Sequence, residues 1–93
     1  MIKTFGDKAT KKLFETGKAN ALSRDLSRRA IRRLEYIHLA GTLEDLRVPT
    51  GNRFHAVSGK RNGQYSISIN DPWRICFKFV DGDAYDVEIT DYH

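Results

Sequence analysis

Three adjacent side chains at the end of the chain can all take part in proton transfer, because Asp91-Tyr92-His93 provides a carboxylate, a phenol and an imidazole. A histidine is suited to this chemistry because its unperturbed pKa is about 6.5. Asp91 can orient or charge such a histidine. A packed terminal strand is the alternative interpretation of the same three residues.

Cleavage of RNA is one reaction that such groups can carry out. RNA contains its own nucleophile, the 2′-hydroxyl, so in principle its cleavage needs no metal ion. It needs a base for the 2′ proton, an acid for the departing 5′ oxygen, and cations for the charge on the phosphate. Arg74 offers a planar guanidinium that can hold a phosphate. The 3 histidines and single cysteine follow no metal-site spacing, so metal-free ribonuclease chemistry is compatible with these residues.

The elements that must position these groups are indicated by a change of hydrophobic period. After "VPTGNR", apolar residues alternate with a period of two, which is typical of β-strands. Strands are expected at residues 54–57, 65–69, 73–80 and 84–90. Asn62-Gly63 and Asp81-Gly82 are typical two-residue hairpin turns, because both central positions need positive φ, and residues 70–72 supply a third reversal. The strands should therefore form an antiparallel meander.

Alternation also predicts two different faces of this sheet. The odd-numbered residues of the central strands are apolar and should face the core: Tyr65, Ile67, Ile69, Trp73, Ile75, Phe77 and Phe79. The even-numbered residues should form a polar, cationic and open face that includes Arg74 and Lys78. Strict continuation of the last strand would put Asp91 and His93 on the core side and Tyr92 on the polar side.

The first half of the chain predicts a short strand at residues 2–5, followed by two helices. Asp7 should cap a helix through about residue 15, which Gly17 ends. Ser23 should begin a second helix that ends at Gly41. The order β-α-α-β-β-β-β indicates an α+β fold, a small antiparallel sheet with both N-terminal helices packed on one face.

Arginines of the second helix fall opposite its apolar arc when residues are placed about 100° apart: Arg24, Arg28, Arg29, Arg32 and Arg33. One interpretation is an ordinary solvated face. The other is a surface that meets the phosphates of RNA or an acidic protein partner. His38, at the edge of the apolar arc, is expected to be a half-buried structural residue.

Length and composition indicate the broad class. With 93 residues and 16 Lys and Arg against 12 Asp and Glu, we expect one domain spanning residues 1–93 and an anionic partner. Cys76 is the only cysteine, which excludes an intramolecular disulfide and favours a reducing compartment. Neither a signal peptide nor a membrane span is indicated. We therefore expect a small cytoplasmic domain that has no membrane contact and needs no metal or cofactor.

Longer motifs then point to a family. The stretch "GKRNGQYSISINDPWRICFKF", followed by "DGDAYDVEITDYH", resembles the HigB-type toxins of bacterial toxin–antitoxin pairs, which belong to the RelE/ParE superfamily. "MIKTF", "KKLFETG" and "LRVPTGNRFHAVSGKRNG" also fit, so the resemblance covers nearly the whole chain. It implies a RelE-like microbial ribonuclease fold and a ribosome-dependent messenger RNA interferase, which cuts the codon in the A site by metal-free acid/base catalysis. It also implies a helix-turn-helix, HigA-like antitoxin, through which alone the toxin would reach operator DNA.

The resemblance also assigns site residues. It implies catalytic roles for His55, Asp91, Tyr92 and His93. It implies that Arg74 contacts the phosphate, in a basic setting to which Lys60, Arg61 and Lys78 contribute as RNA-binding residues. His55 and His93 become a candidate acid/base pair, in which the proton taken by each is left open. Without the family, His55 would be interpreted as an exposed imidazole at the edge of a loop.

Two other functions are compatible with the same fold and charge. A ParE-like toxin inhibits DNA gyrase by binding a protein, and would not require two histidines and a terminal tyrosine. A non-catalytic RNA-binding or partner-binding module would use only the basic faces. The terminal "DYH" favours the nuclease over both, because function is determined by the site and not by the fold.

Overall fold

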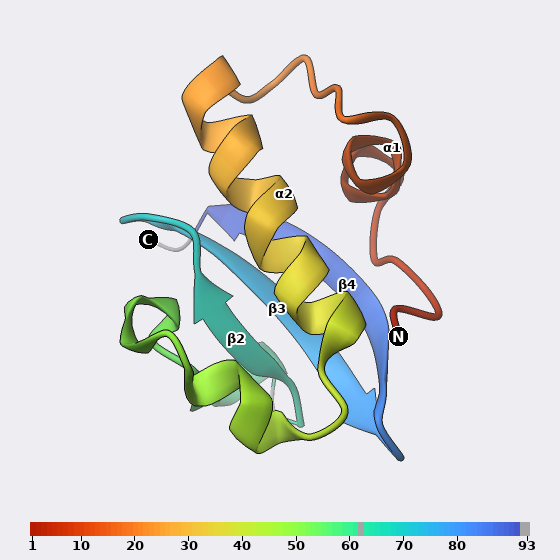
Figure 1. Cartoon of the computed structure of the whole chain (residues 1–93), viewed down its shortest axis with the longest axis vertical. Helices are drawn as coiled ribbons and strands as arrows, with labels where there is room; N and C mark the ends of the chain where they lie inside the picture. The colour runs from red at the N-terminus through yellow and green to blue at the C-terminus, as the bar shows by residue number, and fades with distance from the viewer. Residues whose placement is uncertain (62, 92–93) are drawn as a thin grey trace.

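The computed structural model describes residues 1–61 and 63–91 and confirms the predicted α+β fold (Figure 1). Two helices precede an antiparallel sheet in which the strands follow one another in chain order, β1-β2-β3-β4. The helices and strands are α1 (Lys8–Thr16), α2 (Arg24–Leu39), β1 (His55–Ala56), β2 (Tyr65–Ser68), β3 (Trp73–Val80) and β4 (Asp83–Asp91). Three short 3₁₀ helices that the sequence did not predict lie at Leu43–Arg47, Thr50–Asn52 and Gly59–Arg61.

Local capping determines where the helices begin and end. The Asp7 carboxylate accepts a hydrogen bond from the Thr10 backbone N–H at 2.6 Å, and Gly17 at φ +76° closes the last turn of α1 onto Leu13. Ser23 Oγ accepts from the Leu26 N–H at 3.1 Å and begins α2. The predicted caps are confirmed, except that α2 ends at Leu39, before Gly41.

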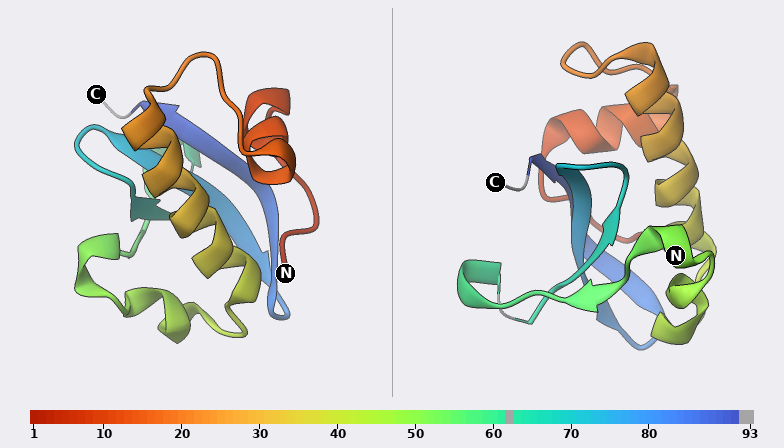
Figure 2. Two further views of the ribbon diagram at one scale, coloured as in Figure 1. Left: turned by 45° about the horizontal axis from the view of Figure 1, so that its top comes forward. Right: turned by 90° about the vertical axis from the view of Figure 1, so that its left-hand side faces the viewer.

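The core lies between α2 and one face of the sheet. Fully buried side chains of α2 meet fully buried side chains of β2, β3 and β4: Leu34 and Ile37 on the helix, and Ile67, Ile75, Phe77 and Val87 on the sheet. Figure 2 shows α2 on one side of the sheet, whereas the 3₁₀ helix Gly59–Arg61 projects on the other side. The predicted core face of odd-numbered residues is therefore confirmed for the central strands, and the second sheet face does not pack against α2.

The N-terminal segment differs from the expected strand at residues 2–5. It forms only two isolated parallel bridges to β4, Ile2 with Ala84 and Phe5 with Val87. A β-bulge in β4, where Asp86 has φ +55°, separates the two bridging residues of β4 by three positions. A regular ladder needs a two-residue repeat, so the bulge explains why the segment runs beside β4 without forming a continuous strand.

Two of the three predicted turns between strands are confirmed. Asp81 and Gly82 have φ of +50° and +83°, and residues 70–72 reverse the chain between β2 and β3, as predicted. The two-residue hairpin expected at Asn62-Gly63 is wrong, because the 3₁₀ helix Gly59–Arg61 lies within the connection. The connection from β1 to β2 is closed by a hydrogen bond from the Val57 N–H to the Gln64 carbonyl at 2.9 Å. Asn62 itself lies outside the described residues.

Candidate active site

Strand register brings four side chains into one row across the sheet. His55 on β1 is opposite Ser66 on β2, Ser66 is opposite Cys76 on β3, and Cys76 is opposite Glu88 on β4. Residues that are directly opposite share a face, and this face is the one that does not carry the core residues Ile75 and Phe77. Two residues further along these strands, Ser68, Arg74 and Thr90 form a second row on the same face.

This second face is less open than the sequence predicted. Ser66 and Cys76 have 0% of their surface exposed and Ser68 has 6%, so the prediction of an open face is wrong along its middle. Alternation identifies which residues share a face, but long side chains on the same face can cover the short ones. Arg61, for example, reaches over to Glu88 on β4, with its Nη1 3.1 Å from the Glu88 carboxylate.

The pKa of the buried Cys76 thiol depends on its burial and on the charged groups around it. Burial raises the pKa of Cys76, while the nearby Arg61 and Arg74 guanidinium groups act in the opposite direction and Glu88 adds to the rise. The thiol therefore stays neutral at physiological pH, despite two guanidinium groups within electrostatic range.

A hydrogen-bonded chain connects the exposed histidine of this face with its central arginine. Arg74 Nε donates to Ser66 Oγ at 2.9 Å, and His55 Nε2 lies 3.3 Å from the same oxygen. His55 Nδ1 lies 3.0 Å from the Ala56 carbonyl oxygen. Because a carbonyl oxygen can only accept, this contact requires the proton on Nδ1, which leaves Nε2 of the neutral imidazole to accept from the Ser66 hydroxyl.

Arg74 is held by a second contact as well. Its Nη2 donates to the Arg53 carbonyl at 3.0 Å, which together with the Ser66 bond fixes the plane of the guanidinium. Arg74 is directly opposite Thr90 and next to Trp73, which pairs with Asp91 at the end of β4. The fixed cation therefore lies beside the strand end that leads to the last residues of the chain.

The predicted catalytic residues are only partly brought together. His55 and Arg74 share the Ser66 oxygen, whereas Asp91 is exposed and lies in the row of Trp73, as strict alternation predicted. Tyr92 and His93 lie outside the described residues.

The other predicted RNA-binding cations occupy different parts of this face. Arg61 lies on it and pairs with Glu88, and Lys60 is exposed on the projecting 3₁₀ helix. Lys78 is four residues from Arg74, which is about 13 Å along a strand, and pairs with Asp86 at 3.3 Å. The structure therefore groups Arg61 with Arg74 and separates Lys78 from them.

The arginines of α2 do not form one face. Arg24, Arg28 and Arg32 are exposed, and Arg29 pairs with Asp25 at 3.4 Å. Arg33 is half-buried and its Nε donates to the Ser68 carbonyl at 3.2 Å, so the prediction of a solvent-facing position is wrong for this residue.

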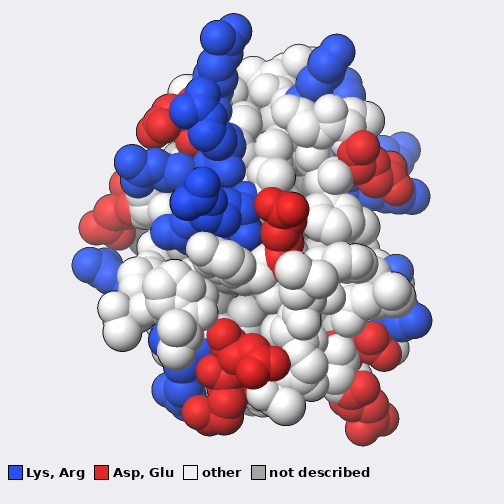
Figure 3. Space-filling model, viewed as in Figure 1, with Lys and Arg blue, Asp and Glu red and all other residues white. Residues whose placement is uncertain are grey.

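Helix geometry explains this difference. Position 33 is seven residues from Leu26, which rotates it only about 20° away from that buried residue. The exposed residues Arg24, Arg28 and Arg32 belong to α2, and Figure 3 shows a stripe of Lys and Arg side chains along this helix.

Ser66 is the site residue that sequence reasoning missed. The sequence places Ser66 among the even-numbered polar residues of its strand and predicts no further role for it. Its even number could have indicated this role, because it puts Ser66 on the same face as Arg74, where longer side chains can bury a short polar one. Its partnership with His55, 11 positions away in the chain, depends on a register that the sequence does not encode locally.

Residues 1–61 and 63–91 contain no group of three or more His, Cys, Asp or Glu side chains that could hold a metal ion. Within the same residues, no helix combines the length and the apolar character needed to cross a bilayer.

Similar structures support the fold. A mutant of YafQ from E. coli matches with a TM-score of 0.60 at 14% identity, covering 98% of this chain and 91% of that one. A Staphylococcus aureus YoeB–YefM toxin–antitoxin complex contains a chain that matches with a TM-score of 0.56 at 11% identity, covering 100% and 98%. At such low identities the likeness shows the fold alone.

Similar sequences show the family. Endoribonuclease HigB from Proteus vulgaris is 37% identical over 93 residues, which is 100% of both chains. Toxin HigB-1 from Vibrio cholerae serotype O1 is 36% identical over 85 residues, or 90% of each chain. Residues 3–93 match the family described as the RelE-like toxin of type II toxin-antitoxin system HigB. The chain therefore belongs to the HigB-like toxins, the RelE-like toxins of type II toxin–antitoxin systems.

Proposed function

We propose that this toxin is an endoribonuclease, like its Proteus vulgaris relative, and that it cuts messenger RNA in the A site of the ribosome. The observation that carries the proposal is the chain of hydrogen bonds from His55 through Ser66 to Arg74. It holds an imidazole that can exchange protons and a guanidinium that can bind a phosphate on either side of one hydroxyl oxygen. Such a pair suits a reaction in which a proton is removed next to a phosphate that gains charge.

His55 is the general base in this proposal. Its Nδ1 proton is directed at the Ala56 carbonyl, so Nε2 carries the lone pair that can accept the 2′ proton. Ser66 must release Nε2 to the substrate, while its oxygen continues to accept from Arg74. The 2′ oxygen then bonds to phosphorus as the bond to the 5′ oxygen breaks, which yields a 2′,3′-cyclic phosphate and a 5′-hydroxyl.

The end of the chain supplies the remaining groups. His93 gives the proton to the departing 5′ oxygen, Asp91 orients it, and Tyr92 stacks on a base or carries a proton, as the family resemblance implies. The supporting observation is the position of Asp91, whose strand ends directly beside the strand that carries Arg74. Arg61 and Lys60 extend the cationic surface toward the neighbouring phosphates, because both belong to the 3₁₀ helix that projects on this side of the sheet.

The arginine stripe of α2 serves a different contact. Arg24, Arg28 and Arg32 belong to α2, which lies on the opposite side of the sheet from the face that carries His55. Their exposure suits the phosphates of ribosomal RNA. A toxin that acts on ribosomes works in the cytoplasm. It reaches operator DNA only as a complex with a helix-turn-helix antitoxin.

Single-turnover cleavage of a reporter messenger RNA, with and without ribosomes, tests the proposed reaction. We expect discrete cuts only with ribosomes, and a loss of at least about 100-fold for His55→Ala and for His93→Ala, since each removes a proton-transfer group. His38→Gln is the matched control: its Nδ1 accepts from the Ile2 N–H at 3.1 Å, away from the site, so cleavage should stay within twofold. Undiminished cleavage by a folded His55→Ala variant contradicts the proposal, and inhibition of DNA gyrase without RNA cleavage would support the ParE-like alternative.

Reversing two charges on α2 tests the ribosomal contact. Arg28→Glu with Arg32→Glu should weaken ribosome association and lower its salt dependence by about one unit of slope per lost cation. Arg29→Glu is the control, because Arg29 is already paired with Asp25. Equal salt dependence of ribosome binding in both variants would show that the stripe is an ordinary solvated surface.

A further inference from the structure

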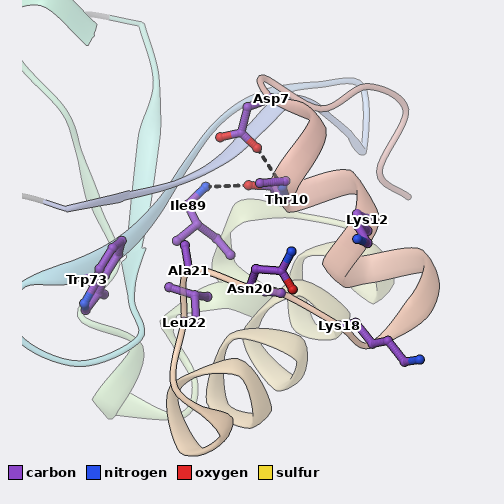
Figure 4. Close-up of a pocket in the computed structure, with 11 residues that line it drawn as sticks. Asp7, Thr10, Lys12, Lys18, Asn20, Ala21, Leu22, Trp73 and Ile89 are labelled. Atoms are coloured by element: carbon purple, nitrogen blue, oxygen red, sulfur yellow. Dashed lines mark hydrogen bonds between the residues drawn. The ribbon is translucent and has the colours of Figure 1, made fainter.

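A preformed apolar pocket lies on the helix side of the sheet, away from the His55–Ser66–Arg74 chain. It has a volume of about 290 Å³ and opens between α1, the connection to α2, and the end of the sheet where β3 begins and β4 ends (Figure 4). Leu22, Trp73 and Ile89, which line it, are half-buried and pack against the edge of the core. The volume is about twice that of an engineered apolar cavity that admits benzene, so the pocket is large enough for a bulky apolar side chain.

Hydrogen bonds fix the position of α1 against β4 at one wall of this pocket. Thr10 Oγ1 accepts from the Ile89 N–H at 3.0 Å, and the Thr10 N–H is bound by the Asp7 carboxylate at 2.6 Å (Figure 4). These bonds attach the start of α1 to the outer edge of β4. Gly17, with φ +76°, then turns the chain away from α1, so that residues 18–22 form the opposite rim. An occupant would need little rearrangement of the backbone, which favours tight binding.

The rim of the pocket is cationic. Lys12 and Lys18 line it and are exposed, and among residues 1–61 and 63–91 neither takes part in an ion pair. The Asp7 carboxylate, which also lines the pocket, already caps α1. An apolar floor with a cationic rim is complementary to a large apolar side chain within an acidic segment.

We propose that this pocket binds the protein antitoxin, through one bulky apolar anchor residue with Asp or Glu residues beside it. A type II toxin has a protein antitoxin. The cationic face around Arg74 and the arginine stripe of α2 are both proposed to bind RNA, so neither is needed for the antitoxin. The inference rests on the family and goes beyond the proposed nuclease function. An anchor in the pocket would contact Trp73, which precedes Arg74 on β3 and is the partner of Asp91 on β4. The antitoxin would therefore lie on the helix side of the sheet, opposite the face that carries His55.

Filling the pocket and reversing its rim charges test this inference. Ala21 lines the pocket and is exposed, so Ala21→Trp should fill the pocket with little effect on folding. Lys12→Glu with Lys18→Glu reverses the rim without touching the core. Lys11→Glu is the matched control, because Lys11 is an exposed lysine of the same helix that does not line the pocket. All variants are titrated with the purified cognate antitoxin in a His55→Gln background, which permits expression.

We expect the Kd for the antitoxin to rise at least tenfold for Ala21→Trp and for the double lysine variant, and less than twofold for Lys11→Glu. With His55 restored, ribosome-dependent cleavage by these variants should stay within twofold of the unsubstituted toxin, and added antitoxin should no longer suppress it. A Kd that is unchanged within twofold in both pocket variants overturns the inference. Loss of cleavage with intact antitoxin binding also overturns it, because the pocket would then belong to the RNA.

The two proposals fail in distinguishable ways. If the unsubstituted toxin shows no cleavage but the pocket variants lose the antitoxin, the nuclease proposal fails and the docking site stands. The melting temperature of each variant separates loss of folding from loss of binding, and the surface lysine pair provides a second variant if Ala21→Trp unfolds the chain.

Discussion

Removing one hydroxyl group should disturb the candidate active site more than its small size suggests. Ser66 has 0% of its surface exposed, and its oxygen lies 2.9 Å from Arg74 Nε and 3.3 Å from His55 Nε2. Ser66→Ala deletes both contacts and removes the acceptor of a partly buried guanidinium N–H. Ser68→Ala is the matched control, because it lies on the same strand and face, and its contact with Arg33 uses a backbone carbonyl that alanine retains.

The expected magnitude follows from these contacts. Losing an acceptor for a charged donor costs about 1–2 kcal/mol of unfolding free energy, because Arg74 is only half-buried and water can replace part of the bond. For a chain of this length, that lowers the melting temperature by about 4–8 °C per kcal/mol. Arg74 keeps its bond to the Arg53 carbonyl, so it should be loosened and not released. We expect a loss of about tenfold in cleavage, equivalent to about 1.4 kcal/mol in the barrier.

Single-turnover cleavage on ribosomes, measured at saturating and subsaturating toxin concentrations, separates positioning from binding. Ser66→Ala should lower the maximal rate, while the concentration for half-saturation stays the same because the basic surfaces are intact. A general loss of folded protein would instead lower the amplitude at an unchanged rate. If Ser66→Ala and Ser68→Ala cleave at the same rate, Ser66 does not position the guanidinium and the reasoning is wrong.

Three further predictions concern single side chains. Arg74→Lys should lower cleavage by at least about 100-fold with a fall in melting temperature no larger than that of Ser66→Ala, because one ammonium group cannot make both the Ser66 and the Arg53 contacts of the guanidinium; a lysine variant with normal cleavage would contradict the phosphate role. Asp45 accepts from the Thr42 and Gly41 N–H groups, which lowers its pKa, so its stabilising effect should be present above the unfolded carboxyl pKa of about 3.9 and lost as pH falls through the lower folded value. Urea unfolding of Asp45→Ala should accordingly differ from the parent at about pH 7 and converge with it in strong acid, and a constant difference would refute this. Burial raises the pKa of Cys76, so a thiol reagent should label it at neutral pH far more slowly in the folded toxin than in urea, and equal rates would show that the thiol is not protected.

The two sides of the sheet separate the proposed contacts. The His55–Ser66–Arg74 chain lies on the face opposite α2, whereas the apolar pocket and the arginine stripe lie on the helix side. Substitutions on one side can therefore be used as controls for the other. The antitoxin experiment depends on this separation, since a variant that escapes the antitoxin is informative only if it still cuts RNA.

Local patterns in the sequence determined the two helices, the central strands and most of their boundaries. The caps at Asp7 and Ser23, the turn at Asp81-Gly82 and the alternation through the central strands each depend on a few neighbouring residues, and the structure confirms all of them. The motifs of the second half also identified the family correctly. Such signals are readable because φ preferences and side-chain periodicity act over short distances along the chain.

Only the tertiary structure decided which of these residues meet. The bond between Ser66 and His55 spans 11 positions and that between Arg33 and Ser68 spans 35, so both depend on register and on how α2 lies on the sheet. The 3₁₀ helix that replaces a tight hairpin likewise carries Arg61 across to Glu88, 27 positions away. Composition could predict a cationic face, but not that Arg74 and His55 would both contact the buried hydroxyl of Ser66. Side chains far apart in sequence form that contact only after the backbone has folded, because a shift of one residue in register would turn each of them to the opposite face.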